Sequence, residues 1–195
     1  MKKMISVCGY AASVLLFLSY VVILGTSLFP EVCAEYRLYY IDKDLQDWLG
    51  YGGLQYRLGT PVVFRSTAED RTKRRGNSWN SFEEDGCWTY GDHSTLYFSG
   101  ISPEEGKAGT ETPERYVEIE VQEVREGAVS EVCANGEPIG QIASAGTFRF
   151  ELPQGMPEGD ILLLEFFTEG FGAVGEDARN QGIKVREIVI DDAVE

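Results

Sequence analysis

A chain of 195 residues with a formal net charge of −15 leaves room for one domain of ordinary size once a leader is set aside. Its acidity argues against nucleic acid or an anionic lipid surface as a partner, because Lys and Arg bind these by displacing counterions. The basic cluster, residues 71–75, lies in a polar stretch and is interpreted as a solvated loop, with a local anion contact as the alternative.

The chain begins with Lys2 and Lys3, followed by an uncharged run from Met4 to Phe29. As a helix this run would be about 39 Å long, more than the ~30 Å hydrocarbon core of a bilayer. The two lysines favour the cytoplasmic side, so we expect the rest of the chain outside the membrane. Residues 1–34 are either a retained anchor of a single-pass membrane protein or the cleaved signal peptide of a secreted or periplasmic one.

Residues 35–195 are expected to form one extracytoplasmic domain. At its start, residues 36–41 and 61–64 are rich in aromatic and β-branched side chains and are predicted strands. Between them, residues 42–49 are predicted to form a short helix that the following glycines end.

The clearest strand pattern runs from Arg115 to Gln122, where Val117, Ile119 and Val121 alternate with polar residues. A period of two with one charged face indicates a half-buried strand in an antiparallel sheet. Residues 93–98, before a Gly- and Pro-rich loop, are predicted to form another strand.

Further strands are predicted in the second half of the sequence. Asn135-Gly136 is the preferred two-residue hairpin turn, and it lies between the first two of them, residues 128–134 and 137–142. In the last predicted strand, residues 183–190, the alternation of apolar residues changes phase between Val185 and Ile188, which indicates a β-bulge. Short strands separated by turn signals predict an all-β fold, an antiparallel β-sandwich preceded by one hydrophobic helix. These strands are 128–134, 137–142, 148–152, 161–167 and 183–190.

Little in the sequence indicates catalysis. His93 is the sole histidine, no serine lies in a Gly-x-Ser-x-Gly elbow, and no Cys or His pair has zinc spacing. We therefore predict no catalytic residue, no metal and no cofactor. Two alternatives stay open: calcium held by carboxylates at Asp177, Asp191 and Asp192, and glycan chemistry at residues 83–85.

Two cysteines, Cys87 and Cys133, lie in the predicted domain. An oxidising compartment permits a disulfide between them, and two buried free thiols are the alternative.

The stretch from Gly76 to Gly91 carries two tryptophans among polar residues. Trp79, Trp88 and Tyr90 are predicted to bind sugar rings by stacking, with Glu83 orienting the ligand through hydrogen bonds. Aromatic side chains of this kind also cap sandwich cores, and that reading stays open.

The chain carries short motifs at residues 76–79, 83–91, 95–98, 129–136 and 176–185. In this order they resemble the uncharacterised β-sandwich domain found C-terminal to bacterial phosphoglycerol transferases and membrane glycosyltransferases. The resemblance implies a jelly-roll-like sandwich outside the cytoplasmic membrane, in work on cell-envelope polysaccharide, and it transfers no catalytic residue. The family's usual arrangement includes an attached transferase, and this sequence departs from it, so a free-standing accessory of such an enzyme or a diverged relative is expected.

The sequence therefore predicts a non-catalytic accessory or binding domain for cell-envelope glycans, attached to the membrane or secreted. A protein-interaction subunit of an envelope glycosyltransferase or phosphoglycerol transferase system is the alternative. A glycan-modifying enzyme is the third reading.

Overall fold

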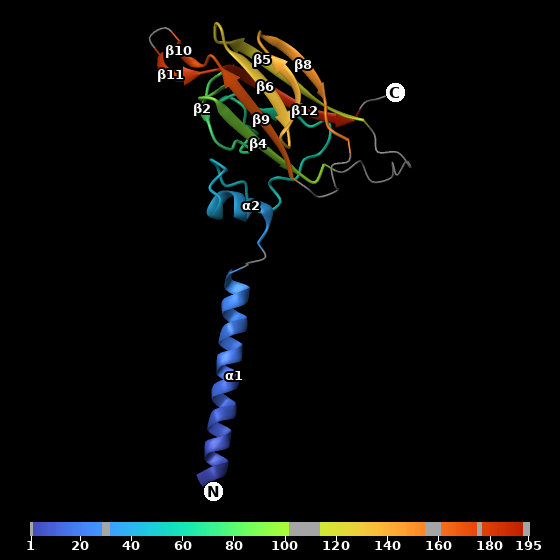
Figure 1. Ribbon diagram of the computed structural model, residues 1–195. Coiled ribbons are helices and arrows are strands. Elements are labelled where there is room, and N and C mark those ends of the chain that lie inside the picture. Colours follow the sequence, from blue (N-terminus) through green and yellow to red (C-terminus); the bar gives the residue numbers. More distant parts are fainter. Residues whose placement is uncertain (1, 29–31, 102–113, 155–160, 175–176, 193–195) are drawn as a thin grey trace. The chain divides into compact units, whose positions relative to one another are not determined.

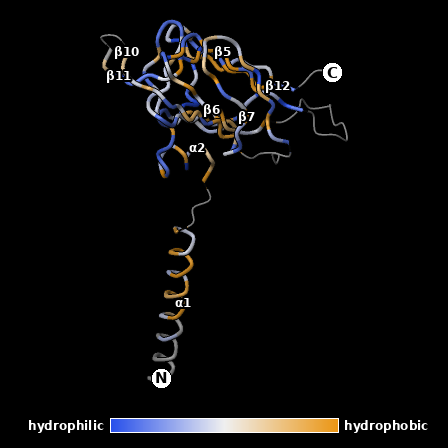
Figure 2. Tube along the Cα trace, turned by 45° about the horizontal axis from the view of Figure 1, so that its top comes forward, coloured by the Kyte–Doolittle hydropathy of each residue, from blue (hydrophilic) through white to orange (hydrophobic). Residues whose placement is uncertain are grey.

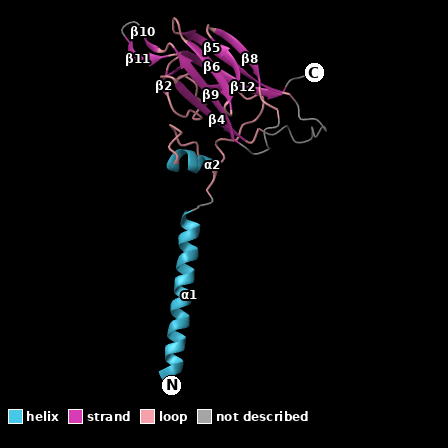
Figure 3. Ribbon diagram, in the orientation of Figure 1, coloured by secondary structure: helices cyan, strands magenta, loops and turns pink. Residues whose placement is uncertain are grey.

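The computed structural model describes residues 2–28, 32–101, 114–154, 161–174 and 177–192. The chain divides into two compact units, Met1–Cys33 and Ala34–Glu195. In the second unit, two antiparallel sheets pack face to face, as Figures 1 and 3 show. The predicted all-β antiparallel sandwich is confirmed.

The larger sheet has six strands, and three of them pair directly with β12. Its order is β2-β3-β12-β5-β8, with β1 also on β12. The strands are β1 (Val62–Val63), β2 (Trp79–Phe82), β3 (Cys87–Thr89), β5 (Arg115–Val124), β8 (Gly146–Glu151) and β12 (Ile183–Asp192).

The smaller sheet has four strands in the order β4-β9-β6-β7, so β9 is hydrogen-bonded on both sides. A separate two-stranded ribbon pairs β10 with β11. The strands are β4 (His93–Ser99), β6 (Val129–Ala134), β7 (Glu137–Ile142), β9 (Ile161–Glu169), β10 (Gly172–Val174) and β11 (Asp177–Gln181).

The hydrophobic core lies between the sheets. In β5 the three apolar residues of the alternating pattern are buried and the glutamates between them are partly exposed, as the sequence predicts. Full burial of a side chain of Leu or Phe size contributes about 1.5–3 kcal/mol relative to exposure. The largest fully buried side chains include Phe64, Phe98, Phe166, Leu96, Leu164 and Ile188.

Two local predictions in the second half of the domain are also confirmed. Asn135 and Gly136 join β6 to β7 with φ angles of 51° and 80°, the positive values that a type I′ hairpin turn requires. The pairing of β12 with β5 shifts register between Lys184 and Glu187, which is the bulge predicted from the change of phase.

The beginning of the domain differs from the prediction. Residues 36–41 are helical, because α2 (Ala34–Tyr36) continues into a single π-helical turn (Arg37–Ile41). The predicted strand is therefore wrong. The predicted helix at 42–49 is wrong as well, and Lys43, at a φ of 60°, turns the chain out of the helical path.

Tertiary packing explains this helical start. Leu38 is buried together with Leu45, Leu54 and Tyr97 in a second, smaller hydrophobic cluster. Tyr97 belongs to β4, so residues 34–54 cover part of the outer face of the smaller sheet. For the same reason β4 is buried on both faces over most of its length.

The first unit is α1, a helix that spans Lys2–Leu28. Figure 2 shows mostly hydrophobic residues along the part of α1 that is coloured. Judged on the described side chains, which in α1 are those of Tyr10 and residues 12–28, no helix reaches the length and apolarity needed to cross a membrane.

Candidate functional site

Trp79 does not form the predicted sugar platform, because its ring lies in the hydrophobic core. Only 6% of the residue is exposed, and its indole N–H donates a 2.8 Å hydrogen bond to the carbonyl oxygen of Thr95. The ring stacks on Phe64 at a centroid distance of 5.1 Å and meets Phe166 edge to face at 5.8 Å. It therefore has no face free for a ligand.

Trp88 is covered as well, with 3% of its surface exposed. Lys184 pairs with Trp88 across β12 and β3, and its ammonium lies 5.5 Å from the centroid of the indole ring. Of the three predicted stacking residues, only Tyr90 is open to solvent, with 46% exposed. The structure thus places both tryptophans in the alternative role, packing, and leaves Tyr90 alone.

Glu83, the predicted orienting carboxylate, already has cationic partners. Its two oxygens lie 2.8 Å from Lys184 Nζ and 2.9 Å from Arg179 Nη2, and Lys184 is also 2.6 Å from Asp85. Partial burial raises the pKa of Glu83, but the hydrogen bonds from Lys184 and Arg179 outweigh it and hold that pKa below its usual value. This network fixes the cover over Trp88.

Replacing Lys184 with methionine is expected to lower the free energy of unfolding by about 2–3 kcal/mol at pH 7, less than for a fully buried pair because Asp85 is half exposed. The pKa values of Glu83 and Asp85 are lowered in the folded state, so their stabilisation is lost as pH falls through those values. The pKa of Lys184 is raised, because hydrogen bonds to the carboxylates outweigh its burial, so its stabilisation is lost as pH rises through the folded value.

Urea denaturation from pH 3 to pH 10 measures this effect. The difference between wild type and Lys184→Met should be largest between about pH 5 and pH 10 and shrink toward pH 3. Lys73→Met, at an exposed lysine, should change stability by less than about 0.5 kcal/mol. A constant difference across this pH range would contradict the ionic origin.

Of the two possibilities left open for Cys87 and Cys133, the structure has the second, because both are buried free thiols and no disulfide joins them. Cys87 is in β3 of the larger sheet and points into the core, whereas Cys133 is in β6 of the smaller sheet and alternates with the core residues Val132 and Ala134. Packed sheets lie about 10 Å apart, and a disulfide needs Cα atoms within ~7 Å.

Neither thiol is activated as a nucleophile. Burial raises the pKa of Cys87 to about 11, against the opposing effect of Arg75. Burial, with Glu131 and Glu165, also raises the pKa of Cys133. Both groups therefore stay protonated near neutral pH.

The basic cluster is not the solvated loop that the sequence predicts. Arg74 donates hydrogen bonds of 2.6 and 2.5 Å to the carbonyl oxygens of Leu54 and Gln55, and burial lowers its pKa to about 10. Arg75 is 7% exposed and lies over Phe82 at 3.8 Å. Arg74 and Arg75 therefore connect neighbouring segments through hydrogen bonds to backbone carbonyl oxygens, whereas Arg71 and Lys73 are exposed.

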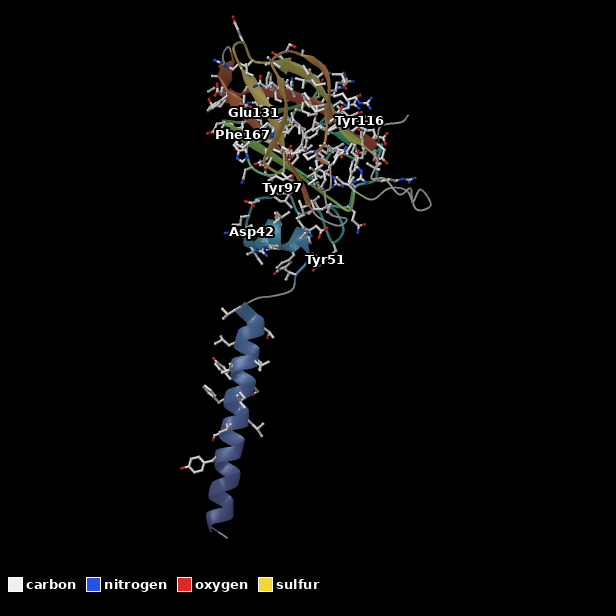
Figure 4. All side chains as sticks on the ribbon, turned by 45° about the vertical axis from the view of Figure 1, so that its right-hand side comes forward. Asp42, Tyr51, Tyr97, Tyr116, Glu131 and Phe167 are labelled. Carbon is white, nitrogen blue, oxygen red and sulfur yellow. The ribbon has the colours of Figure 1, made fainter. Side chains whose placement is uncertain are left out.

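A different surface brings chemistry-bearing side chains together on the outer face of the smaller sheet. Phe167, in the inner strand β9, is 38% exposed and stacks on His93 of β4, with ring centroids 4.4 Å apart and planes 2° from parallel. His93 Nε2 lies 3.0 Å from a carboxylate oxygen of Glu165. Glu131 of β6 pairs with Phe167 in the strand register, and Figure 4 shows these two side chains beside each other.

We call His93, Glu131, Glu165 and Phe167 the His93–Phe167 surface. Toward its other end the sheet face is closed, because Tyr97 is buried under Leu38 and Leu45. Burial raises the pKa of Tyr97, and the nearby Asp44 and Glu165 carboxylates add to this effect. The open part of the face therefore combines an aromatic ring, an imidazole and the partly exposed carboxylate of Glu131, with the buried Glu165 beneath His93.

Sequence reasoning missed this surface, although one signal was present. Residues 161–167 are nearly all apolar and predict a strand buried on both sides. The one charged residue in that run, Glu165, shares a face with Phe167, since side chains alternate along a strand. A carboxylate inside an apolar strand thus marked the face that is not core.

Metal binding finds no support among the described side chains, where no three His, Cys, Asp or Glu residues are grouped to hold an ion. Of the three aspartates considered for calcium, Asp192 forms a 3.1 Å ion pair with Arg115. The side chain of Asp177 lies outside the described part.

No family model matches the chain, and no curated protein matches it in sequence. Among solved structures, an acetyl xylan esterase (Est2A) from the rumen bacterium Butyrivibrio proteoclasticus is 10% identical, with a TM-score of 0.37 over 71% of this chain and 35% of that chain. The CBM36-1 domain of a multidomain xylanase from the hindgut metagenome of Trinervitermes trinervoides is 12% identical, with a TM-score of 0.34 over 70% of this chain and 98% of that chain.

These are distant structural similarities to β-sandwich domains, and they assign no family. The chain spans about a third of the length of the esterase. The resemblance to the domain that follows phosphoglycerol transferases stays a prediction.

Proposed function

We propose that this protein is a membrane-anchored, non-catalytic domain that binds cell-envelope glycans on the His93–Phe167 surface. The observation that carries the proposal is the exposed Phe167 ring on an inner strand of the sheet, held parallel to His93. An apolar ring fixed in place beside polar side chains offers the stacking contact that the C–H face of a sugar needs.

The groups around the ring indicate which glycans fit. Glu131 can accept hydrogen bonds from sugar hydroxyls, while Glu165, which is 9% exposed, is held by His93, and a strand face keeps such groups in fixed positions. The same carboxylates, in a chain of net charge −15, repel phosphate, sulfate and uronate groups. The ligand class is therefore uncharged or amino-sugar polysaccharide.

The anchor is supported by the sequence of α1. Its apolar run follows two lysines and is longer than the h-region of a usual signal peptide. A retained helix would keep the sandwich beside the outer surface of the cytoplasmic membrane, where envelope polymers pass. The protonated thiols support a binding role without bond making.

Phe167→Ala should weaken glycan binding at least tenfold, because losing one aromatic stack corresponds to about 1.5 kcal/mol. Binding of the full chain to an array of uncharged, amino-sugar and acidic glycans identifies the ligand, and titration of the best ligand gives the affinity. Since Phe167 is partly exposed, the variant should retain the fold by circular dichroism.

Tyr90→Ala removes an exposed aromatic residue elsewhere and should leave the affinity unchanged. The proposal is contradicted if no array glycan binds, or if Phe167→Ala binds the best ligand as tightly as the wild type.

A protein-docking function is the second candidate, and a groove favours it. The groove has a volume of about 470 Å³ and lies beside β7, the last strand of the smaller sheet. A peptide could add to this edge by main-chain hydrogen bonds. Co-purification of an envelope glycosyltransferase that survives Phe167→Ala would favour this function. The groove is lined by residues 137–139 and 149–153.

A further inference from the structure

Five aromatic side chains gather at the beginning of the sandwich unit, apart from the His93–Phe167 surface, and of these Tyr39 packs against the smaller hydrophobic cluster. Their rings form a chain of contacts with centroid distances of 4.8–5.7 Å. We call this group the tyrosine–tryptophan cluster. Its members are Tyr36, Tyr39, Tyr40, Trp48 and Tyr51.

Three members of the cluster are exposed to solvent, and the other two, Tyr39 and Trp48, are partly buried. Tyr51 is 79% exposed and Tyr40 is 52% exposed, and the neighbouring Ile41 is half exposed. Of the seven large hydrophobic side chains exposed in the described part of residues 34–195, four lie between Tyr36 and Tyr51. Such a concentration of exposed apolar surface on one short segment marks an interaction site.

The local fold holds the cluster in place. Leu38 and Leu45 turn inward and are buried against Tyr97 of β4, while Tyr36, Tyr40 and Tyr51 of the same segment are exposed. The backbone N–H groups of Asp44 and Leu45 both donate to the carbonyl oxygen of Leu38, which closes the loop beneath the rings. Figure 4 shows Tyr51 projecting from this segment. The rings are therefore presented by a fixed base.

Ring geometry argues against a sugar platform here. A pyranose ring stacks on a flat aromatic face, but neighbouring rings in the cluster are tilted by 39–89° to one another. The contacts Tyr39–Tyr40 and Trp48–Tyr51 are both edge to face, at 89°. The surface thus presents ring edges and hydroxyl groups rather than one plane.

Tyrosine and tryptophan combine an apolar body with a polar tip, and they concentrate where a bilayer meets water. Eight residue steps separate Leu28, the end of α1, from Tyr36. At ~3.3–3.6 Å per residue these steps span less than about 30 Å, so a membrane-anchored α1 keeps the cluster within reach of the interface.

The charged residues around the cluster indicate which region of the bilayer the cluster would contact. Between Ala34 and Tyr51 four acidic residues outnumber Arg37 and Lys43, so attraction to anionic lipids does not drive the contact. The acidic side chains also keep the segment out of the hydrocarbon core. Insertion of the rings into the headgroup region of a zwitterionic bilayer satisfies both constraints.

We propose that the tyrosine–tryptophan cluster is a second membrane contact, which inserts into the interfacial region of the bilayer that holds α1. This inference rests on the membrane anchor proposed above. Two contacts, the proposed α1 anchor and the interfacial cluster, would hold the sandwich close to the membrane and limit its rotation.

The test uses the full chain reconstituted into phosphatidylcholine vesicles with brominated acyl chains, which quench nearby tryptophan. The chain has three tryptophans, and Trp79 and Trp88 are buried in the sandwich. Emission should therefore be partly quenched by the bromines, and the quenched component should disappear in Trp48→Phe. The double substitution Tyr40→Ser, Tyr51→Ser should reduce the quenching of Trp48 at least twofold.

Tyr90→Ser is the matched control, because it removes an exposed tyrosine outside the cluster, and quenching should stay at the wild-type level. Vesicle flotation in alkaline carbonate tests the anchor separately. A chain that floats but shows no quenching of Trp48 overturns the second contact and leaves the anchor intact. A chain that does not float overturns both.

Discussion

Trp79→Ala is expected to lower the free energy of unfolding by about 4 kcal/mol, the largest effect of any single substitution considered for this protein. The indole ring contacts Phe64 and Phe166, which belong to opposite sides of the core, so removing it leaves a cavity between the sheets. The carbonyl oxygen of Thr95 also loses the indole N–H as a hydrogen-bond donor.

Urea denaturation followed by circular dichroism measures this loss. Tyr90→Ala, at an exposed aromatic residue in the same region, should change stability by less than about 0.5 kcal/mol. If Trp79→Ala does not fold, Trp79→Phe keeps a ring in the core and should cost about 1–2 kcal/mol. A loss below about 1 kcal/mol for Trp79→Ala would show that the ring is not a core residue.

Arg75→Met should lower the free energy of unfolding by about 3 kcal/mol, because it removes the donors from buried polar partners. Arg75 Nη1 donates to the carbonyl oxygen of Asn80 at 2.7 Å and lies 3.6 Å from the sulfur of Cys87. Its second terminal nitrogen pairs with Asp47 at 3.2 Å. Methionine fills much of the same volume but offers none of these hydrogen bonds.

Arg71→Met provides the matched control within the basic cluster. Arg71 is exposed and lies 5.7 Å from the centroid of the Phe82 ring, so its loss should cost less than about 1 kcal/mol. Chemical denaturation of both variants at pH 7 compares the two arginines directly. Equal effects would mean that the cluster is a solvated loop after all.

The strands that were predicted correctly can be recognised from the residues within the strand or its adjoining turn. In β5 the alternation of Val117, Ile119 and Val121 with polar residues reflects one buried and one open face. In the β6–β7 hairpin, Asn135-Gly136 fixes the turn and therefore the pairing of both strands. Neither feature depends on residues far away in the sequence.

Other elements depend on distant partners and left no local pattern. β3 has three residues and exists because it pairs with β12, about a hundred positions later. Residues 36–41 are rich in aromatic and β-branched types, yet they are helical because Leu38 packs against Tyr97. Tertiary contacts override such propensities.

The predicted binding residues show the same limit. Trp79 and Trp88 have the composition of a stacking platform, and only the positions of Phe64, Phe166 and Lys184 reveal that they are covered. His93 and Phe167 are 74 positions apart in the numbering and meet only because β4 pairs with β9. A surface assembled across strands is invisible to spacing rules.

The sandwich contains two free thiols, Cys87 in one sheet and Cys133 in the other, with no disulfide bond between them. Cys87 sits in the space that the layers share, whereas Cys133 faces away from it. An alkylating reagent would therefore reach Cys87 only when the layers part, and Cys133 when the second layer loosens on its own. The alkylation rates of the two thiols would therefore report the order in which the two sheets separate and loosen during unfolding.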